Sequence, residues 1–360
     1  MPDALALDSI SVLLVWTAIA VYALAFIAYA IDLARRSAVA IEMQDARVRD
    51  SERERELVGA GVASATAGAA SAGETLAQVR ESQRAAEKAL NAPVSARTKQ
   101  LWARLGTVLT VIGFLFHLAA TIGRGVAAER VPWSNMYEFA LTGTLLIVAV
   151  YLTALFRFDL RFLGSLITGM TVLLLGGATL SFYVEVVPLA DPLKSVWLVI
   201  HVFVATLATA LFALAFGLSV LQLMQGRRER RAIAAVGAVG SDGAVSTGPR
   251  FLRTLPSADA LESLAYRFAI VGFIFWTFTL IAGSIWANDA WGRYWGFDTK
   301  EVWTFVIWVL YAGYIHARAT RGWRGSRSAW LSIIGFTAVL FNFTIVNMFF
   351  KGLHAYSGLS

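Results

Sequence analysis

The chain has 360 residues, of which 58% are hydrophobic and only 15% are charged, and its mean hydropathy is +0.63. This balance excludes a chain of ordinary soluble domains and is typical of a polytopic membrane protein. The absence of cysteine excludes a disulfide framework, an iron–sulfur cluster, a thiolate zinc site and a cysteine nucleophile within this chain. Nucleic acid is not expected as a partner, because the net charge of +7 is distributed according to membrane topology.

Eight charge-free runs are long and apolar enough to cross a bilayer, which takes about 20 residues of helix. We therefore predict an all-α membrane bundle of about eight transmembrane helices. The runs are Ser9–Ile31, Leu105–Gly123, Phe139–Phe156, Phe162–Val184, Ser195–Gly226, Phe268–Asn288, Val302–Ala317 and Ala329–Phe350. The seventh run is the shortest and reaches across only if Glu301 and Arg318 lie at the two interfaces.

The basic residues predict the orientation of the bundle. With residues 34–104 placed in the cytoplasm, only six of the 31 Lys and Arg residues fall outside, and both termini lie outside. The six are Arg124, Arg130, Lys194, Arg293, Lys300 and Lys351. The first run has no basic residues before it and no small-residue cleavage site after it, so we interpret it as a retained span and not as a signal peptide.

Five segments follow from these spans. Residues 1–33 hold the first span, 34–100 a partly disordered cytoplasmic linker, 101–225 spans two to five, 226–265 a basic cytoplasmic linker, and 266–360 spans six to eight. The composition of the two linkers, charged or rich in Ala, Gly and Ser, argues against an independent catalytic domain in either.

The external loop 286–303 concentrates aromatic residues. It contains Trp286, Trp291, Tyr294, Trp295, Phe297 and Trp303 within eighteen positions, interleaved with Gly292 and Gly296. An aromatic belt at the membrane interface is the ordinary interpretation. A flat apolar ligand explains the glycines better, because they let the backbone approach a planar surface while indoles stack on it. Arg293 or Lys300 could meet peripheral carboxylates of such a ligand, and haem meets these requirements.

Four histidines can bind haem iron as neutral imidazoles. His201 lies near the outer end of the fifth run, and His354 lies just past the outer end of the eighth. His117 lies within the second run, and His316 lies near the inner end of the seventh. A buried histidine bonded to a neighbouring helix is the alternative for His117 and His201, and a head-group-facing histidine is the alternative for His316.

Three further sets of residues lie near these positions, and the first two have two interpretations each. Asp298 and Glu301 either orient metal-binding imidazoles or pair with Lys300. The segment Trp133–Glu138 either supports the same pocket or begins the third span, capped by Ser134 or Asn135. Asn342 and Asn347 are expected to be hydrogen-bonding residues between helices.

Several motifs together resemble one family. They are Trp291-Gly-Arg-Tyr-Trp-Gly-Phe-Asp-Thr-Lys-Glu-Val-Trp303, Pro132-Trp-Ser-Asn-Met-Tyr-Glu138, Pro192-Leu-Lys-Ser-Val-Trp-Leu-Val-Ile-His201, Tyr314-Ile-His-Ala-Arg318 and Gly352-Leu-His-Ala-Tyr356. Over residues 100–360 the chain resembles the CcsA (ResC) type of cytochrome c biogenesis protein, also called CcsB, in the haem-handling family with the tryptophan-rich WWD signature. It departs from that signature at Phe297 and Thr299, where the family usually has Trp and Pro.

The resemblance implies a multi-pass subunit of the system II cytochrome c synthetase in the plasma membrane, which binds haem b and presents it externally. Haem is then attached to Cys-X-X-Cys-His in apocytochrome c. The implied axial ligands at the external site are His201 and His354. His316 would serve an earlier intramembrane site, with its second ligand from the ResB partner. The implied loop contacts to haem are Trp291, Arg293, Tyr294, Trp295, Phe297, Asp298, Lys300 and Trp303.

The partners implied are a ResB (CcsB-type) membrane subunit, apocytochrome c, a thioredoxin-like thiol reductase and the lipid bilayer. The chain itself needs no catalytic nucleophile, because the thiols belong to the substrate. His117 and His316 differ in depth by something like half a membrane at about 1.5 Å per residue, so a shared iron would require strong tilting. Two other functions stay open: a haem transporter or chaperone without ligase activity, and a b-type electron-transfer cytochrome.

Overall fold

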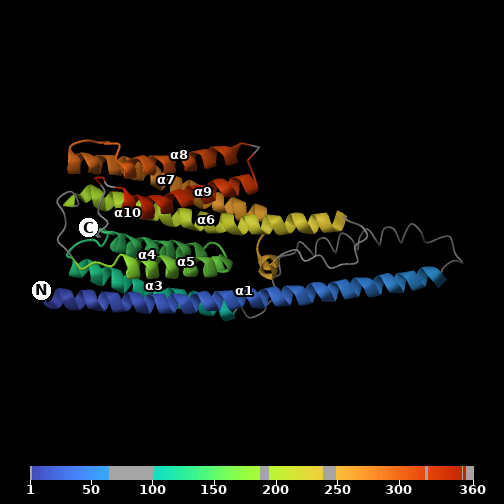
Figure 1. Cartoon of the computed structure of the whole chain (residues 1–360). Coiled ribbons are helices and arrows are strands. Elements are labelled where there is room, and N and C mark those ends of the chain that lie inside the picture. Colours follow the sequence, from blue (N-terminus) through green and yellow to red (C-terminus); the bar gives the residue numbers. More distant parts are fainter. Residues whose placement is uncertain are drawn as a thin grey trace. The chain divides into compact units, whose positions relative to one another are not determined.

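The computed structural model describes residues 2–64, 101–186, 194–237, 249–320, 323–350 and 352–353 (Figure 1). Within these ranges the chain is helical and forms no strand. It divides into two units. The first comprises Met1–Asp32, Leu101–Thr247 and Ser257–Ser360, and the second comprises Leu33–Gln100 and Gly248–Pro256. The first unit contains every apolar run of the sequence.

All eight apolar runs lie in helices, so the predicted all-α membrane bundle is confirmed. The helices are α1 (Pro2–Ser64), α3 (Leu101–Ala127), α4 (Met136–Leu155), η1 (Arg161–Leu163), α5 (Gly164–Ser181), α6 (Val196–Gly237), η3 (Arg250–Thr254), α7 (Ala258–Trp291), α8 (Thr299–Ala319), α9 (Ser326–Phe341), the π-helical η4 (Asn342–Val346) and α10 (Asn347–Phe349).

Seven membrane-crossing candidates meet both length and hydropathy requirements in the described part of the chain. The seventh predicted span, Val302–Ala317 in α8, is not one of them. The 21 residues of α8 measure about 31 Å, enough for a bilayer core. Its tryptophans, tyrosines, His316 and terminal charges lower its mean hydropathy, because these side chains are less hydrophobic than the aliphatic residues that fill the other spans.

Helices extend beyond the predicted spans on the predicted cytoplasmic side. α1 continues as helix to Ser64, within the predicted linker 34–100, whose residues 65–100 lie outside the described ranges. α6 continues to Gly237, and α7 begins at Ala258 behind the N-cap Ser257, whose hydroxyl accepts a hydrogen bond from Ala260 N at 3.3 Å. Arg and Glu are good helix formers, so the charged part of these segments continues the helix without an apolar face.

Several helix contacts bring a glycine against an aromatic ring. On α3, Gly106 and Gly113 lie against the rings of Tyr29 and Tyr22 on α1, where an added Cβ would come within 2.9 and 2.8 Å of ring carbons. α6 packs most extensively on α7, and it also contacts α4 and α9, while α8 packs on α9 and α7. Small residues of this kind let helices approach in a membrane, where lipid is as apolar as the protein.

A buried ion-pair network joins α1, α3 and α4. Arg124 is fully buried and donates to Asp8 at 2.6 Å and to Glu138 at 3.0 Å. Arg130 donates to the other oxygen of Glu138 at 2.5 Å. The backbone N and hydroxyl of Ser134 also donate to Glu138. The network therefore fixes the turn that leads from α3 into α4.

Candidate functional site

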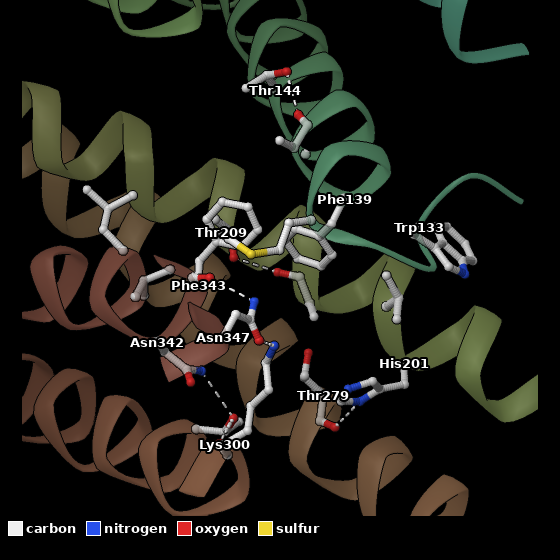
Figure 2. A pocket seen from close by; sticks show the side chains of 18 of the residues that line it. Trp133, Phe139, Thr144, His201, Thr209, Thr279, Lys300, Asn342, Phe343 and Asn347 are labelled. Atoms are coloured by element: carbon white, nitrogen blue, oxygen red, sulfur yellow. Dashed lines mark hydrogen bonds between the residues drawn. The ribbon is translucent and has the colours of Figure 1, made fainter. Parts of the chain in front are cut away.

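A cavity of about 200 Å³ lies among α4, α6, α7, α8 and the last helical segments (Figure 2). Its wall is mainly apolar, and a few polar side chains interrupt it. These polar residues include Asn135, His201, Thr279, Lys300, Asn342 and Asn347. A smaller cavity of about 80 Å³ adjoins the same His201 and is lined by Trp286, Tyr294 and Trp295 of the aromatic loop. His201 thus borders both spaces.

Three positions on one face of α7 orient His201. The ring lies against Gly283, where an added Cβ would come within 2.7 Å of Cε1 and Nδ1. It stacks on Trp286 with an interplanar angle of 20° and a centroid separation of 5.8 Å. Its Nδ1 lies 2.9 Å from the backbone oxygen of Thr279. Positions 279, 283 and 286 follow helical spacing, so α7 holds the ring from a single face.

The contact with Thr279 determines the tautomer of His201. A carbonyl oxygen only accepts, so Nδ1 carries the proton and donates it, and in the neutral imidazole the lone pair is on Nε2. A metal-binding histidine is characteristically oriented in this way, with its second nitrogen donating to a backbone carbonyl or a carboxylate. In the neutral form of His201, Nε2 is therefore the acceptor nitrogen.

The polar side of the cavity is formed by α8 and the chain after α9. Figure 2 shows Lys300 extending to Asn347, whose Oδ1 accepts a hydrogen bond from Nζ. Asn342 lies nearby and donates from Nδ2 to the Thr304 hydroxyl at 3.5 Å. Both asparagines therefore make the interhelical hydrogen bonds that the sequence predicted, and both also line the cavity.

Lys300 precedes the apolar run of α8 and belongs to the aromatic loop 286–303. Desolvation by burial lowers the pKa of its ammonium group to about 8, against the opposing effect of Asp298. A partly buried cation at reduced pKa gains from any anionic group that enters the cavity. The α8 end of the cavity is consequently favourable for a carboxylate.

The segment Trp133–Glu138 begins α4, as one interpretation predicted, and it also lines the cavity. Asn135 is the N-cap of α4, and its Oδ1 accepts from Glu138 N at 2.9 Å. Asn135 and Trp133 also line the cavity. The buried Nδ2 of Asn135 has no hydrogen-bond partner among the described residues. It is a buried donor, which a bound ligand or water would satisfy.

The aromatic residues of loop 286–303 face different surroundings. Trp291 packs on Trp286, with ring centroids 4.8 Å apart, in a cluster with Leu198 and Val202 of α6. Trp303 packs on Phe341 of α9 at 4.4 Å. The rest are closer to the surface: Trp295 and Tyr294 line the smaller cavity, Tyr294 and Phe297 are exposed, and Arg293 lies across Gly296. Trp286 and Trp291 meet at an interplanar angle of 63°, so these two indoles do not form one flat surface.

Two carboxylates, those of Asp298 and Glu301, accept backbone hydrogen bonds where this loop leads into α8. Glu301 Oε2 accepts hydrogen bonds from the backbone N of Gly296 at 2.8 Å and of Asp298 at 3.1 Å. Asp298 is the N-cap of α8, and together the pair forms a capping box. Thr299 is the first residue of the helix, a position at which proline is favoured, so the departure from the family pattern leaves the cap intact. Phe297 has a φ of 56°, which is unusual for a residue with a side chain.

The other histidines lie elsewhere. His117 is fully buried between α1, α3 and α4, where Nε2 lies 2.9 Å from the Leu141 oxygen and Nδ1 lies 3.4 Å from the Tyr22 hydroxyl. This is the arrangement of a histidine bonded to neighbouring helices. His316 is exposed on the surface of α8, away from the cavity lining. His354 lies outside the described residues, one position after Leu353.

Comparison with known proteins identifies the family. The profile of the cytochrome c assembly protein family matches residues 133–354. The cytochrome c biogenesis protein CcsA of Guillardia theta is 33% identical over 246 residues, which cover 66% of this chain and 80% of that protein. CcsA of Gloeobacter violaceus is 30% identical over 294 residues, 71% of this chain and 87% of that protein. The chain belongs to the CcsA family of cytochrome c assembly proteins.

Membership of the CcsA family gives the chain a role in cytochrome c maturation. The long apolar helices make it a multi-pass membrane protein, and the family implies haem handling and membrane partners. The family match spans the cavity, the aromatic loop and His201, and it ends at His354.

Sequence reasoning missed the residues that orient His201. Thr279 and Gly283 are ordinary residues of an apolar helix, and only their spacing to Trp286 sets them apart. The cavity lining of Asn135 was also uncertain, because a helix cap and a ligand-facing amide have the same sequence signal.

Proposed function

We propose that this CcsA-family chain binds haem b as its substrate at the external face and presents it for attachment to apocytochrome c. His201 and His354 are the axial ligands in this proposal. The loop residues Trp291, Arg293, Tyr294, Trp295, Phe297, Asp298, Lys300 and Trp303 form the surroundings of the porphyrin. The chain acts in the plasma membrane with both termini outside.

The orientation of His201 carries the proposal. α7 provides a carbonyl for Nδ1, a glycine that accommodates the ring and an indole that stacks on it, and together these leave Nε2 with the lone pair. A histidine that only joined two helices would not need to border two cavities. Lys300 and the Nδ2 of Asn135 add a cation and an amide donor, which suit the two carboxylates of haem.

The chemistry of attachment needs no nucleophile from this chain. Each thiol of the apocytochrome adds across one haem vinyl group, so that sulfur bonds to the inner carbon, a proton goes to the terminal carbon, and no oxidant is consumed. The protein contributes orientation, exclusion of water and a pair of imidazoles that favours a defined redox state of the iron. The histidine of Cys-X-X-Cys-His then replaces one axial ligand.

His316 is proposed to serve an earlier, intramembrane stage of haem transfer. Its exposure on α8 supports a ligand that is completed by another protein, since no other histidine described here lies beside it. The second imidazole would come from a ResB (CcsB-type) subunit. A thioredoxin-like reductase would keep the thiols of apocytochrome c reduced.

The test is the absorption spectrum of the purified chain, with and without ResB, across histidine variants. We expect a low-spin bis-histidine haem spectrum that is lost in His201→Gly and in His354→Gly and is restored by added imidazole. His117→Gln is the matched control, because an amide can still donate to the Leu141 oxygen. Retention of external haem and of cytochrome c maturation in the double variant of His201 and His354 would overturn the ligand assignment.

Reconstitution with ResB, haem, reductant and a Cys-X-X-Cys-His peptide separates the synthetase from a haem transporter. Thioether formation that depends on His201 supports the synthetase. Haem release to the peptide without a covalent bond would indicate a chaperone, and haem that never dissociates would indicate a b-type cytochrome.

A further inference from the structure

Asp298 contacts two separate parts of the chain. Its Oδ2 accepts from Lys300 N at 3.4 Å, which caps α8. Its Oδ1 accepts a hydrogen bond from the backbone N of Leu353 at 3.0 Å, 55 positions further along the chain. The cap needs only one of the two oxygens. The second oxygen holds the peptide nitrogen of Leu353, the residue before His354.

Gly352 makes this approach possible. A Cβ at position 352 would lie 3.0 Å from Cγ of Asp298 and closer still to Oδ1, so a side chain there cannot coexist with the observed contact. Glycine is thus required at Gly352 by the close approach of the carboxylate. In the sequence Gly352-Leu-His354, the residue closest to the Asp298 carboxylate therefore has no side chain.

A second contact fastens the other end of the same segment. Lys300, two residues after Asp298, donates to Asn347, which lies six residues before Leu353. A small cavity between these contacts is lined by Asp298, Lys300, Val346, Asn347 and Gly352. The first turn of α8 therefore holds the chain from Asn347 to Leu353 at both ends.

We infer that Asp298 is a positioning residue for His354. It ties the backbone before this histidine to the same loop that carries the tryptophans, so that the second imidazole is placed relative to the aromatic loop and not only by the last helix. The inference rests on the proposed function, in which His354 is an axial ligand. In this role Asp298 acts through the backbone N of Leu353, in addition to its place in the loop that surrounds the porphyrin.

The first readout needs no haem. The chain has no cysteine, so Ala355→Cys provides a single reactive thiol beside His354. In this parent, Asp298→Ala and Gly352→Ala are expected to raise the labelling rate by a membrane-impermeant maleimide about tenfold, the factor expected for loss of one hydrogen bond to a charged acceptor. Asp298→Asn keeps an acceptor for Leu353 N and should label at an intermediate rate.

Two controls separate positioning from general loosening. Glu301→Gln weakens the other half of the capping box without contacting Leu353, and Gly176→Ala adds a methyl group where nothing lies within 4 Å. Both should label within twofold of the parent. If Glu301→Gln labels as fast as Asp298→Ala, weakening of α8 explains the effect and the inference is wrong.

The second readout is the haem spectrum of the same variants without the added cysteine. Asp298→Ala and Gly352→Ala should lose the low-spin spectrum and regain it with free imidazole, as His354→Gly does. If the wild-type spectrum does not depend on His354, the proposed function fails, whatever the labelling shows. If that spectrum depends on His354 but both variants keep parental labelling and spectra, the proposed function stands and the positioning role is refuted.

Discussion

The Nδ1 atom of His201 on α6 donates a hydrogen bond to the backbone oxygen of Thr279 on α7, 2.9 Å away. Because the acceptor belongs to the backbone, no substitution of Thr279 removes it. The orientation of this imidazole is instead sensitive to the space that surrounds it, which depends on Gly283.

Gly283→Ala is predicted to displace His201. The added methyl group would come within 2.7 Å of two ring atoms, and overpacking of this kind costs about 1–3 kcal/mol. The expected result is loss of the bis-histidine spectrum with the helix content unchanged by circular dichroism. Gly177→Ala on α5, where nothing lies within 4 Å, should behave like wild type. An unchanged spectrum in Gly283→Ala would show that the ring position is irrelevant to haem.

His117→Leu is predicted to lower stability without changing the haem spectrum. The substitution leaves the Leu141 oxygen and the Tyr22 hydroxyl without their buried partner, at a cost of about 1–3 kcal/mol. Thermal unfolding in detergent measures the loss, and His117→Gln should recover part of it. A spectrum that changes in His117→Gln while stability is retained would instead assign this histidine to haem.

Haem affinity is predicted to fall as the pH rises through about 8. Burial lowers the pKa of Lys300 to about 8, so below this pH the ammonium form meets an incoming carboxylate. A bound anion raises that pKa, and binding above pH 8 must therefore take up a proton, which weakens affinity by at most tenfold per pH unit. Equilibrium titration between pH 6.5 and 9.5 checks this.

Lys300→Arg is the matched variant for the pH series, because its guanidinium stays charged throughout the range. The haem affinity of this variant should not decline above pH 8. The same decline in both proteins would assign the titration to another group.

Thr299→Pro is predicted to stabilise the chain by about 0.4–1 kcal/mol. Thr299 is the first residue of α8, where proline has a suitable φ and removes no helical hydrogen bond, and it restricts the unfolded chain. The melting temperature in detergent should rise, whereas Val302→Pro, inside the helix, should lower it. A lower melting temperature for Thr299→Pro would mean that the backbone entering α8 is incompatible with proline.

Glu138→Gln is predicted to destabilise the chain by about 3–5 kcal/mol, because it leaves Arg124 and Arg130 with a neutral partner in a buried network. Asp159→Asn removes the same charge from the partly exposed pair with Arg161 and should cost at most about 1 kcal/mol. Chemical denaturation measures the free energy of unfolding of both variants. Equal losses would show that burial does not strengthen the ion pairs of Glu138.

The sequence predicted the helices well because a span needs a long apolar run, and all eight runs are helical. It located the aromatic loop and His201 for a similar reason, since both stand out against apolar surroundings. It could not predict that Thr279 and Gly283 hold the His201 ring, because they lie 78 and 82 residues away from it in the sequence. It could not predict that Asp298 binds Leu353 N either, because these residues are 55 positions apart. The axial roles of His201 and His354 came from the family resemblance and stay predictions.

The π-helical turn of η4 could not be predicted from the sequence either, since Asn342-Phe-Thr-Ile-Val346 contains no glycine or proline to mark it. A π turn accommodates one residue more than an α turn, so it rotates whatever follows by about 100° around the helix axis. The length of this turn thus sets the angular position of the α10 residues around the helix axis. Deleting a single residue there would carry Asn347 away from Lys300, even though every side chain in the remaining sequence were unchanged.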